Sequence, residues 1–428
     1  MDVLCLLFAR RLQRWWGSVY VRAYGPAILP GIVTDHQNGT YDVMFLPMDE
    51  GLYIVEVVLS FSHPPPFSQF PLESFTEPVY EGYMLPDFPL LLSVNDPEPS
   101  DVVAVDPLPR CTMADMFESS PTSAVHAGRW IVKEKMITRP FSLSNQIKDA
   151  TLDGYERGEN SLGIRMEYHP INCSLPEESA LKDSHNFVQC IKQRWDRNRR
   201  LHIILAGDSN MKLQAKLLDR ENFLGLASII SYIDLQNGSI GAMAYMNATI
   251  KKIHSRIAKF NVPTDYIIVF NMGLHDILNL CGSENFGLAI DFGARGDARC
   301  GITYKRKLAE LTQILQKQFP SLLIVFQTTH AAWPKWGNYG VSWPVNVTQP
   351  LPHSSDFAHY FYEIAWDVMT FFGIPVMDTY WLTLSRPDHR ESSLTQTLAH
   401  KMAHAGHEVY SVLTRKFVMM ILETMCGK

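Results

Sequence analysis

Arg200-Leu-His-Ile-Ile-Leu-Ala-Gly-Asp-Ser-Asn-Met211 joins a short apolar run to the tetrapeptide Gly207-Asp-Ser-Asn210, and leucines follow at helical spacing. This pattern predicts a buried strand that ends in a tight turn into a helix. Ser209 would then lie at the carboxyl edge of a parallel sheet. Its backbone N–H would stand at a helix N-terminus, where partial positive charge favours a developing oxyanion. We therefore interpret Ser209 as a nucleophile.

Short apolar strands alternate with helical patterns after residue 200. Runs such as Tyr266-Ile-Ile-Val-Phe270 and Leu322-Leu-Ile-Val-Phe326 are typical of strands that are covered on both faces. This alternation predicts an α/β fold with a parallel sheet, in which ligands bind beyond the carboxyl ends of the strands. The predicted strands are 201–206, 229–235, 266–271, 322–327 and 374–378, and the predicted helices are 210–218, 246–258, 303–318, 357–371 and 405–424.

The composition is that of a globular protein with more than one domain. The chain has 428 residues, of which 46% are hydrophobic and 19% charged. A formal net charge of -6 without long basic runs predicts no nucleic-acid partner. No apolar run approaches the roughly 20 residues of a membrane span. The segment from Met1 to Leu7 is a poor signal peptide, because its apolar part is short and its arginines follow it.

Sequons and cysteines favour a secretory protein. Asn-x-Ser/Thr sequences occur more often than chance would supply. Disulfides with plausible loop lengths could join Cys173 to Cys190 and Cys281 to Cys300. Because the chain has seven cysteines, at least one stays unpaired, and Cys5 is the candidate. No cysteine or histidine cluster has metal-ligand spacing, and no cofactor is implied. The five sequons begin at Asn38, Asn172, Asn237, Asn247 and Asn346.

The first 110 residues differ in character from the rest. Residues 17–61 alternate in a strand pattern, and Asn38-Gly39 is a tight-turn signal. From His63 to Pro109 prolines are dense, so we expect an extended connector without regular structure. The segment 111–194 shows little periodicity and is interpreted as an extension that packs against the following domain.

Two further motifs would reach the same sheet edge as Ser209. Gly273-Leu-His275-Asp276 follows the predicted strand 266–271, and His404 precedes the last predicted helix. Ester chemistry needs a nucleophilic hydroxyl, an imidazole that accepts its proton, and N–H donors for the oxyanion. The sequence supplies each of these groups.

This order of motifs resembles the SGNH/GDSL hydrolases, and within them the PC-esterase group that includes the neurexophilin-and-PC-esterase proteins. The resemblance covers about residues 110–425 and implies a three-layer α/β/α fold. The run from Val33 to Val57 resembles the closing strands of a filamin-type immunoglobulin-like repeat. Because only the later strands are recognised, we expect the chain to begin inside that domain. The implied organisation is a partial immunoglobulin-like β segment at 1–62, a proline-rich connector at 63–110 and a hydrolase domain at 111–428.

The resemblance assigns roles by position. Ser209 would be the nucleophile and His404 the base. The oxyanion would be held by Ser209, by Gly238 (with Gly241 as a competitor) and by His275, which stands where the family has asparagine and can donate the same hydrogen bond. The supporting residues would be Asp208, Asn210, Gly273 and Asp276.

The acid that orients the base departs from the family pattern. The family places an aspartate three residues before the catalytic histidine, where this chain has Lys401. The literal Asp356-Phe-Ala-His359 precedes the fifth strand and is interpreted as a decoy. Asp388 or Asp378 could orient His404 instead, or the site could be a Ser–His dyad. Other candidates near the edge are His400 and His407 as alternative bases, His330, and Trp333 and Trp336, which could stack on sugars or pack within a loop.

The resemblance implies a serine esterase or O-acyltransferase that acts on acyl, most simply acetyl, esters of glycans in the secretory pathway. The rival hypothesis is an inactive glycan-binding or adhesion protein whose immunoglobulin-like segment contacts a protein partner. Lys401 favours the rival, and the intact Gly207-Asp-Ser-Asn210 favours the enzyme.

Overall fold

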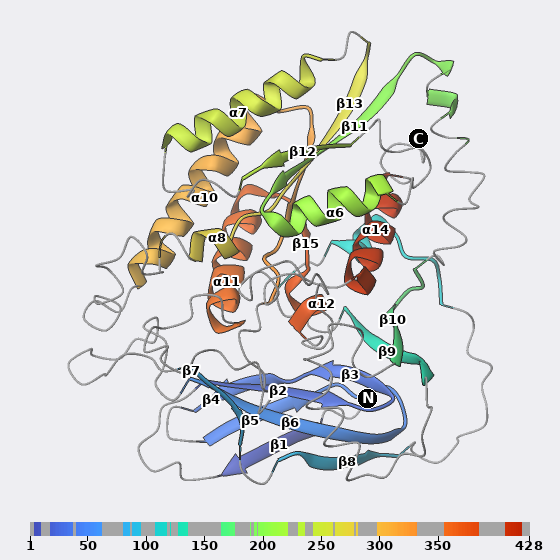
Figure 1. Ribbon diagram of the computed structural model, residues 1–428, viewed down its shortest axis with the longest axis vertical. Coiled ribbons are helices and arrows are strands. Elements are labelled where there is room, and N and C mark those ends of the chain that lie inside the picture. Colours follow the sequence, from blue (N-terminus) through green and yellow to red (C-terminus); the bar gives the residue numbers. More distant parts are fainter. Residues whose placement is uncertain are drawn as a thin grey trace.

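The computed structural model describes residues 4–9, 18–36, 40–61, 80–85, 88–95, 108–117, 120, 127–135, 164–175, 189, 192–194, 196–220, 230–235, 243–259, 262–277, 280, 298–331, 355–384 and 407–421. A five-stranded parallel sheet forms the centre of the part after residue 200, with strand order β12-β11-β13-β14-β15 (Figure 1). The α/β fold with a parallel sheet is therefore confirmed. Its strands are β11 (Arg200–Gly207), β12 (Ile230–Asp234), β13 (Thr264–Phe270), β14 (Leu323–Gln327) and β15 (Val376–Met377).

Helices cover both faces of this sheet. Successive residues of its strands point to opposite sides, so both faces carry apolar side chains that helices bury. Ile204 and Ile268 belong to a core that includes residues of α7, α10 and α11. Leu205 and Val269 belong to a second core that includes residues of α6 and α14. These helices are α6 (Ser209–Arg220), α7 (Met243–Ile257), α10 (Ala298–Gln318), α11 (Ser355–Phe372) and α14 (His407–Ile421).

In the described part of the chain, some short helices lie outside the predicted set. Among them are α1 (Met113–Met116), α8 (Leu274–Asp276) and α12 (Tyr380–Leu384), each shorter than two turns. Such elements carry too few residues for a helical period to show in the sequence. Among the described helices, none is both long and apolar enough to cross a bilayer.

Antiparallel strands form two further sheets in the N-terminal half, at the bottom of Figure 1. A three-stranded sheet has the order β1-β5-β4, and its antiparallel pair β4 and β5 flanks the predicted Asn38-Gly39 turn, which lies outside the described residues. A seven-stranded sheet, here called the N-terminal sheet, has the order β10-β9-β3-β2-β6-β7, with β8 also paired to β6. The strands are β1 (Leu4–Ala9), β2 (Ser18–Tyr24), β3 (Ala27–Pro30), β4 (Ile32–Asp35), β5 (Thr40–Phe45), β6 (Gly51–Phe61), β7 (Tyr80–Met84), β8 (Leu90–Val94), β9 (Gly128–Lys135) and β10 (Ile164–Pro170).

The strand pairings correct one expectation. The proline-rich segment was expected to lack regular structure, yet β7 and β8 pair with β6, because the prolines flank short runs that keep all their backbone donors. The described part of segment 111–194 packs against the second half as expected, since Trp130 and Tyr168 share a core with α14, and β9 also pairs with β3 of the N-terminal sheet. The domain boundaries and the filamin-type resemblance stay predictions.

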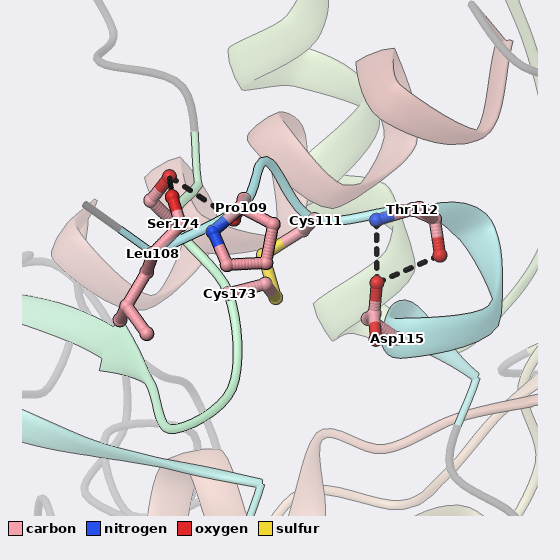
Figure 2. Close-up of a disulfide and its surroundings, with 7 residues drawn as sticks. All are labelled: Leu108, Pro109, Cys111, Thr112, Asp115, Cys173 and Ser174. Carbon is pink, nitrogen blue, oxygen red and sulfur yellow. Dashed lines mark hydrogen bonds between the residues drawn. A yellow bond between two sulfur atoms is a disulfide. The ribbon is translucent and has the colours of Figure 1, made fainter. Parts of the chain in front are cut away.

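One disulfide joins Cys111 to Cys173, with Cα atoms 4.8 Å apart (Figure 2). The predicted pairing of Cys173 with Cys190 is therefore wrong. Backbone hydrogen bonds hold the two segments side by side, from Cys111 N to Ser174 O (3.1 Å) and from Ser174 N to Pro109 O (2.9 Å). This alignment depends on a fold-level contact, which loop spacing cannot reveal. The proposed Cys281–Cys300 pair and the thiol of Cys5 lie outside the described side chains.

Candidate functional site at the carboxyl edge of the parallel sheet

Ser209 lies at the turn that the sequence predicts. β11 ends at Gly207 and α6 begins at Ser209, whose side chain is half-buried. A Cβ on Gly207 would stand 2.8 Å from Met211 Cβ and 3.2 Å from Asn271 Cβ, so glycine permits the tight turn. The buried Asp208 carboxylate accepts a hydrogen bond from the N–H of Asn210 (2.9 Å), which caps the first turn of the helix.

Neighbouring strands hold this turn in place. Leu235 N donates to Gly207 O, and Asn271 N donates to Ala206 O, both at 2.9 Å. The Tyr232 hydroxyl lies 3.1 Å from the carbonyl oxygens of both Gly207 and Asp208. The backbone that carries Ser209 is thus bonded to the ends of β12 and β13.

The strand order places Ser209 where open α/β sheets bind ligands. The chain runs from β11 to β12 on one side and returns to β13 on the other side of β11. The connections leave this point in opposite directions, and open α/β sheets generally bind their ligands beyond the carboxyl ends of the strands at such a point. Neighbouring strands are about 4.8 Å apart, so the residues that follow β11 and β13 share one edge.

The motif after β13 is shaped by a close backbone approach. A Cβ on Gly273 would collide with Thr329 Oγ1, so no larger residue fits without movement. α8 starts at Leu274 and contains the half-exposed His275 and the buried Asp276. His275 thus follows the carboxyl end of β13, the strand that pairs with β11, and its role as an oxyanion donor stays a prediction.

Buried polar side chains next to this motif donate hydrogen bonds to backbone carbonyl oxygens. Asn271 Nδ2 donates to the carbonyl oxygens of Gln327 (2.9 Å) and Thr328 (3.0 Å), which joins the ends of β13 and β14. The Tyr304 hydroxyl donates to Met272 O at 2.8 Å. Burial, with a smaller contribution from the charge of Asp276, holds the pKa of Tyr304 well above its usual value. Tyr304 therefore remains a hydrogen-bond donor at all ordinary pH values.

The last helix contributes a contact that sequence reasoning missed. The Tyr410 hydroxyl on α14 donates to Asn210 Oδ1 at 2.9 Å, and both side chains are buried. The Tyr410 ring centroid lies 6.1 Å from that of His330, which is 1% exposed after the end of β14. The sequence placed His330 at this edge, but nothing in the spacing of Tyr410 indicated that it reaches the residue after the candidate nucleophile.

Several predicted site residues lie outside the described part of the chain. These are the base candidates His404 and His400, the acid candidate Asp388, Lys401 at the position where the family has an acid, the oxyanion candidates Gly238 and Gly241, and Trp333 and Trp336. His407 begins α14, but its side chain is also outside the described set. Their roles stay predictions.

Asp378, the second acid candidate, is tied to the fold. Its buried carboxylate accepts a hydrogen bond from Trp381 N (2.9 Å) at the start of α12. Burial, followed by the charge of Asp378, raises the pKa of Tyr362. These contacts join Asp378 to α12 and Tyr362, and its role as the acid, like that of Asp388, stays a prediction.

His359 lies near the start of α11, as the decoy interpretation expected. Its Nε2 is 3.3 Å from Glu363 Oε1, and its ring stacks on Tyr362 with centroids 5.7 Å apart. The hydrogen bond from His359 is the largest influence on the pKa of Glu363, which is lowered. α11 packs on the face of the sheet opposite to α6, and the His359 ring lies beside Tyr380 and Trp381, with centroids 5.2 and 5.8 Å away. The decoy interpretation stays a prediction.

Metal ligands are not gathered in the described residues, where no three His, Cys, Asp or Glu side chains are placed to hold an ion. The described site contains a serine at a helix N-terminus, a turn that requires glycine, and a histidine in the short helix that follows the adjacent strand.

Comparisons with known proteins give structural similarities only. No protein-family profile and no curated protein matches the chain. Among solved structures, a protein from Lactobacillus plantarum is 15% identical, with a TM-score of 0.30 over 53% of this chain and 98% of its own. A GDSL-like lipase from Parabacteroides merdae is 12% identical, with a TM-score of 0.29 over 54% of this chain and 96% of its own. At these values the likeness decides neither fold nor chemistry, which rest on the residues described above.

Proposed function

We propose that the protein is a serine esterase or O-acyltransferase that acts on acyl esters of glycans, with acetyl as the simplest acyl group. The observation that carries the proposal is the position of Ser209, at the start of α6 and beyond the carboxyl end of β11 at the point where the strand order reverses. A serine there combines accessibility with N–H donors of a helix N-terminus.

The proposed reaction has two steps. The Ser209 hydroxyl attacks the ester carbonyl while His404 accepts its proton, and the alcohol leaves with that proton. Water or a sugar hydroxyl then attacks the acyl-serine and releases the acid or the new ester. The N–H groups of Ser209 and Gly238, with His275, would hold the oxyanion in both steps. Asp388 would orient His404, and no cofactor is required.

The glycan substrate and the secretory pathway are the finer part of the proposal. The secretory pathway is supported by the five sequons and by the Cys111–Cys173 disulfide, because disulfides persist in oxidising compartments. The glycan substrate rests on the resemblance of the motifs to the PC-esterase group together with these secretory signals. The rival is an inactive glycan-binding or adhesion protein. Lys401, at the position where an acid would orient the base, is the observation that favours it.

A fluorophosphonate probe tests the nucleophile without knowledge of the substrate. We expect covalent labelling of the wild type at Ser209, loss of labelling in Ser209→Ala, and much slower labelling in His404→Ala. Ser255→Ala is the matched control, because Ser255 is an exposed serine on α7. Hydrolysis of acetylated sugars by the same four proteins tests the substrate class. Labelling that survives in Ser209→Ala would overturn the assignment.

A further inference from the structure

α12 connects the parallel sheet to the N-terminal sheet, between which it lies in Figure 1. On the side of the parallel sheet, hydrogen bonds hold it to the residues that follow β14. Thr379 N donates to Thr328 Oγ1 (2.8 Å), and Ala331 N donates to Thr383 Oγ1 (2.9 Å). All four residues are buried. α12 therefore shares the carboxyl edge with His330, which lies between Thr328 and Ala331 in the chain.

On its other side, α12 ends against side chains of the N-terminal sheet. The last carbonyl groups of a helix have no partners within the helix and must find donors elsewhere. In α12, Leu382 O accepts a hydrogen bond from Trp130 Nε1 of β9 (3.1 Å), and Leu384 O accepts one from the Tyr20 hydroxyl of β2. Trp130 is 1% exposed, so these bonds form inside the protein.

α14 is held by the same sheet. Arg415 Nη1 lies 3.8 Å from Glu167 Oε1 of β10. Trp130 and Tyr168 belong to the same buried core as Tyr410 and other apolar residues of α14. The N-terminal sheet thus contacts both helices that flank the segment in which His404 lies.

These contacts form one continuous route to the nucleophile turn. From the donors Trp130 and Tyr20 the route passes through α12 to Ala331 and His330, and the His330 ring lies beside Tyr410. Tyr410 donates to Asn210, whose backbone N–H is held by Asp208. The groups at each link are buried, and a close-packed interior transmits small displacements between neighbouring groups.

We propose that the N-terminal sheet is a positioning element of the serine site, and that Trp130 and Tyr20 are the positioning residues through which it acts. The inference rests on the proposed function, because it assigns the sheet a role at Ser209. It differs from an independent binding module, which would leave the serine site unchanged when its contacts to α12 are removed. The sheet contributes here by completing the hydrogen bonds of α12.

Tyr20→Phe is the sharpest variant, because it removes one hydroxyl and keeps the ring. Tyr53→Phe is its matched control: the fully buried Tyr53 also donates to a carbonyl oxygen, Asp49 O (3.0 Å), but entirely within the N-terminal half. We expect the rate of fluorophosphonate labelling at Ser209 to fall about tenfold in Tyr20→Phe, since small displacements of a nucleophile have large kinetic effects. Tyr53→Phe should label at the wild-type rate. Trp130→Phe should behave like Tyr20→Phe.

Hydrogen exchange gives a readout that does not depend on reactivity. Amides of α12 and of residues 328–331 should exchange faster in Tyr20→Phe and Trp130→Phe and remain protected in Tyr53→Phe. A double-mutant cycle of Tyr20→Phe with Tyr410→Phe tests the route itself. Because the two residues act on one connected unit, the combined loss of labelling rate should be smaller than the product of the single losses.

Equal labelling rates and equal exchange in Tyr20→Phe and Tyr53→Phe would overturn the proposal. Faster exchange with an unchanged labelling rate would also overturn it, by showing a purely structural contact. If the wild type does not label at all, the proposed function fails by itself, and the exchange data still show whether the sheet holds α12.

Discussion

The Tyr410 hydroxyl donates a 2.9 Å hydrogen bond to Asn210 Oδ1, and this bond joins the last helix to the residue that follows Ser209. The two residues are 200 positions apart in the sequence, and both are buried. The bond sets the direction of the Asn210 side chain at the start of α6. It also places the first turn of α14, which contains Tyr410, next to the nucleophile turn.

Tyr410→Phe should lower both stability and Ser209 reactivity. Loss of the hydroxyl leaves Asn210 Oδ1 buried without its donor, which costs about 1–3 kcal/mol of unfolding free energy. Denaturant unfolding and fluorophosphonate labelling measure the two effects. Tyr266→Phe is the control, because Tyr266 also donates to a carbonyl oxygen, Ile257 O (2.9 Å), from the first half of β13. It should lose stability but label normally, and equal labelling by both variants would contradict a role for Tyr410 at the site.

Gly273→Ala should distort the strand end that carries His275. The added Cβ would collide with Thr329 Oγ1, and relief requires the buried Thr329 side chain to move and to give up its hydrogen bond to Met272 O, at a cost of about 1–3 kcal/mol. Labelling of Ser209 should fall as well, because α8 follows Gly273 directly.

Gly373→Ala is the matched control for that substitution. Gly373 has φ of +63° and nothing within 4 Å of an added Cβ, so its cost is conformational, about 1–2 kcal/mol. It should unfold at lower denaturant concentration and label at the wild-type rate. A normal labelling rate in Gly273→Ala would show that the motif after β13 does not shape the site.

His202 should make stability depend on pH below neutrality. Burial, with Arg256 as a smaller cause, lowers the pKa of His202 from 6.5 to about 4. The unfolded chain therefore binds more protons than the folded one between these values. The part of the unfolding free energy that depends on neutral His202 is fully present above pH 6.5. It is lost as the pH falls toward 4, and the loss is at most about 3 kcal/mol.

Unfolding of the wild type and His202→Gln across this pH range measures the effect. His202 Nε2 lies 2.7 Å from Ser231 Oγ, and its ring packs edge-on against Tyr266, so glutamine keeps a polar contact while it removes the titration. The wild type should lose more stability than the variant as the pH falls from 6.5 to 4. Parallel curves for the two proteins would contradict the assignment.

Removal of the Cys111–Cys173 disulfide should destabilise the protein by up to about 4 kcal/mol, because the two cysteines are 62 positions apart and the bond restricts a long loop in the unfolded chain. Cys111→Ser/Cys173→Ser avoids a free thiol at either position. Because this variant lacks the bond, the midpoint of its denaturant unfolding should match that of the reduced wild type. A wild type whose unfolding is insensitive to reductant would contradict the bond.

Much of the second half could be predicted from periodicity. β11, β13 and β14 were expected within two residues of their observed bounds, because a run buried on both faces has few other solutions. The turn at Ser209 was also expected, since Gly207 and Asp208 are suited to a tight turn and a helix cap. The catalytic partners could not be tested in the same way, because His404 and Asp388 fall outside the described residues.

What the sequence by itself determined was local: the alternation of strands and helices and the placement of Ser209 at a strand-to-helix turn, because side-chain period and turn preference act over a few residues. Only the tertiary structure decided that Cys111 pairs with Cys173 and that β9 joins the N-terminal sheet. It also decided that Trp130 and Tyr20 donate hydrogen bonds to the last carbonyl groups of α12, and that Tyr410 donates one to Asn210. These contacts join residues far apart in the chain. They depend on which buried surfaces and unpaired hydrogen-bonding groups meet after the elements have packed.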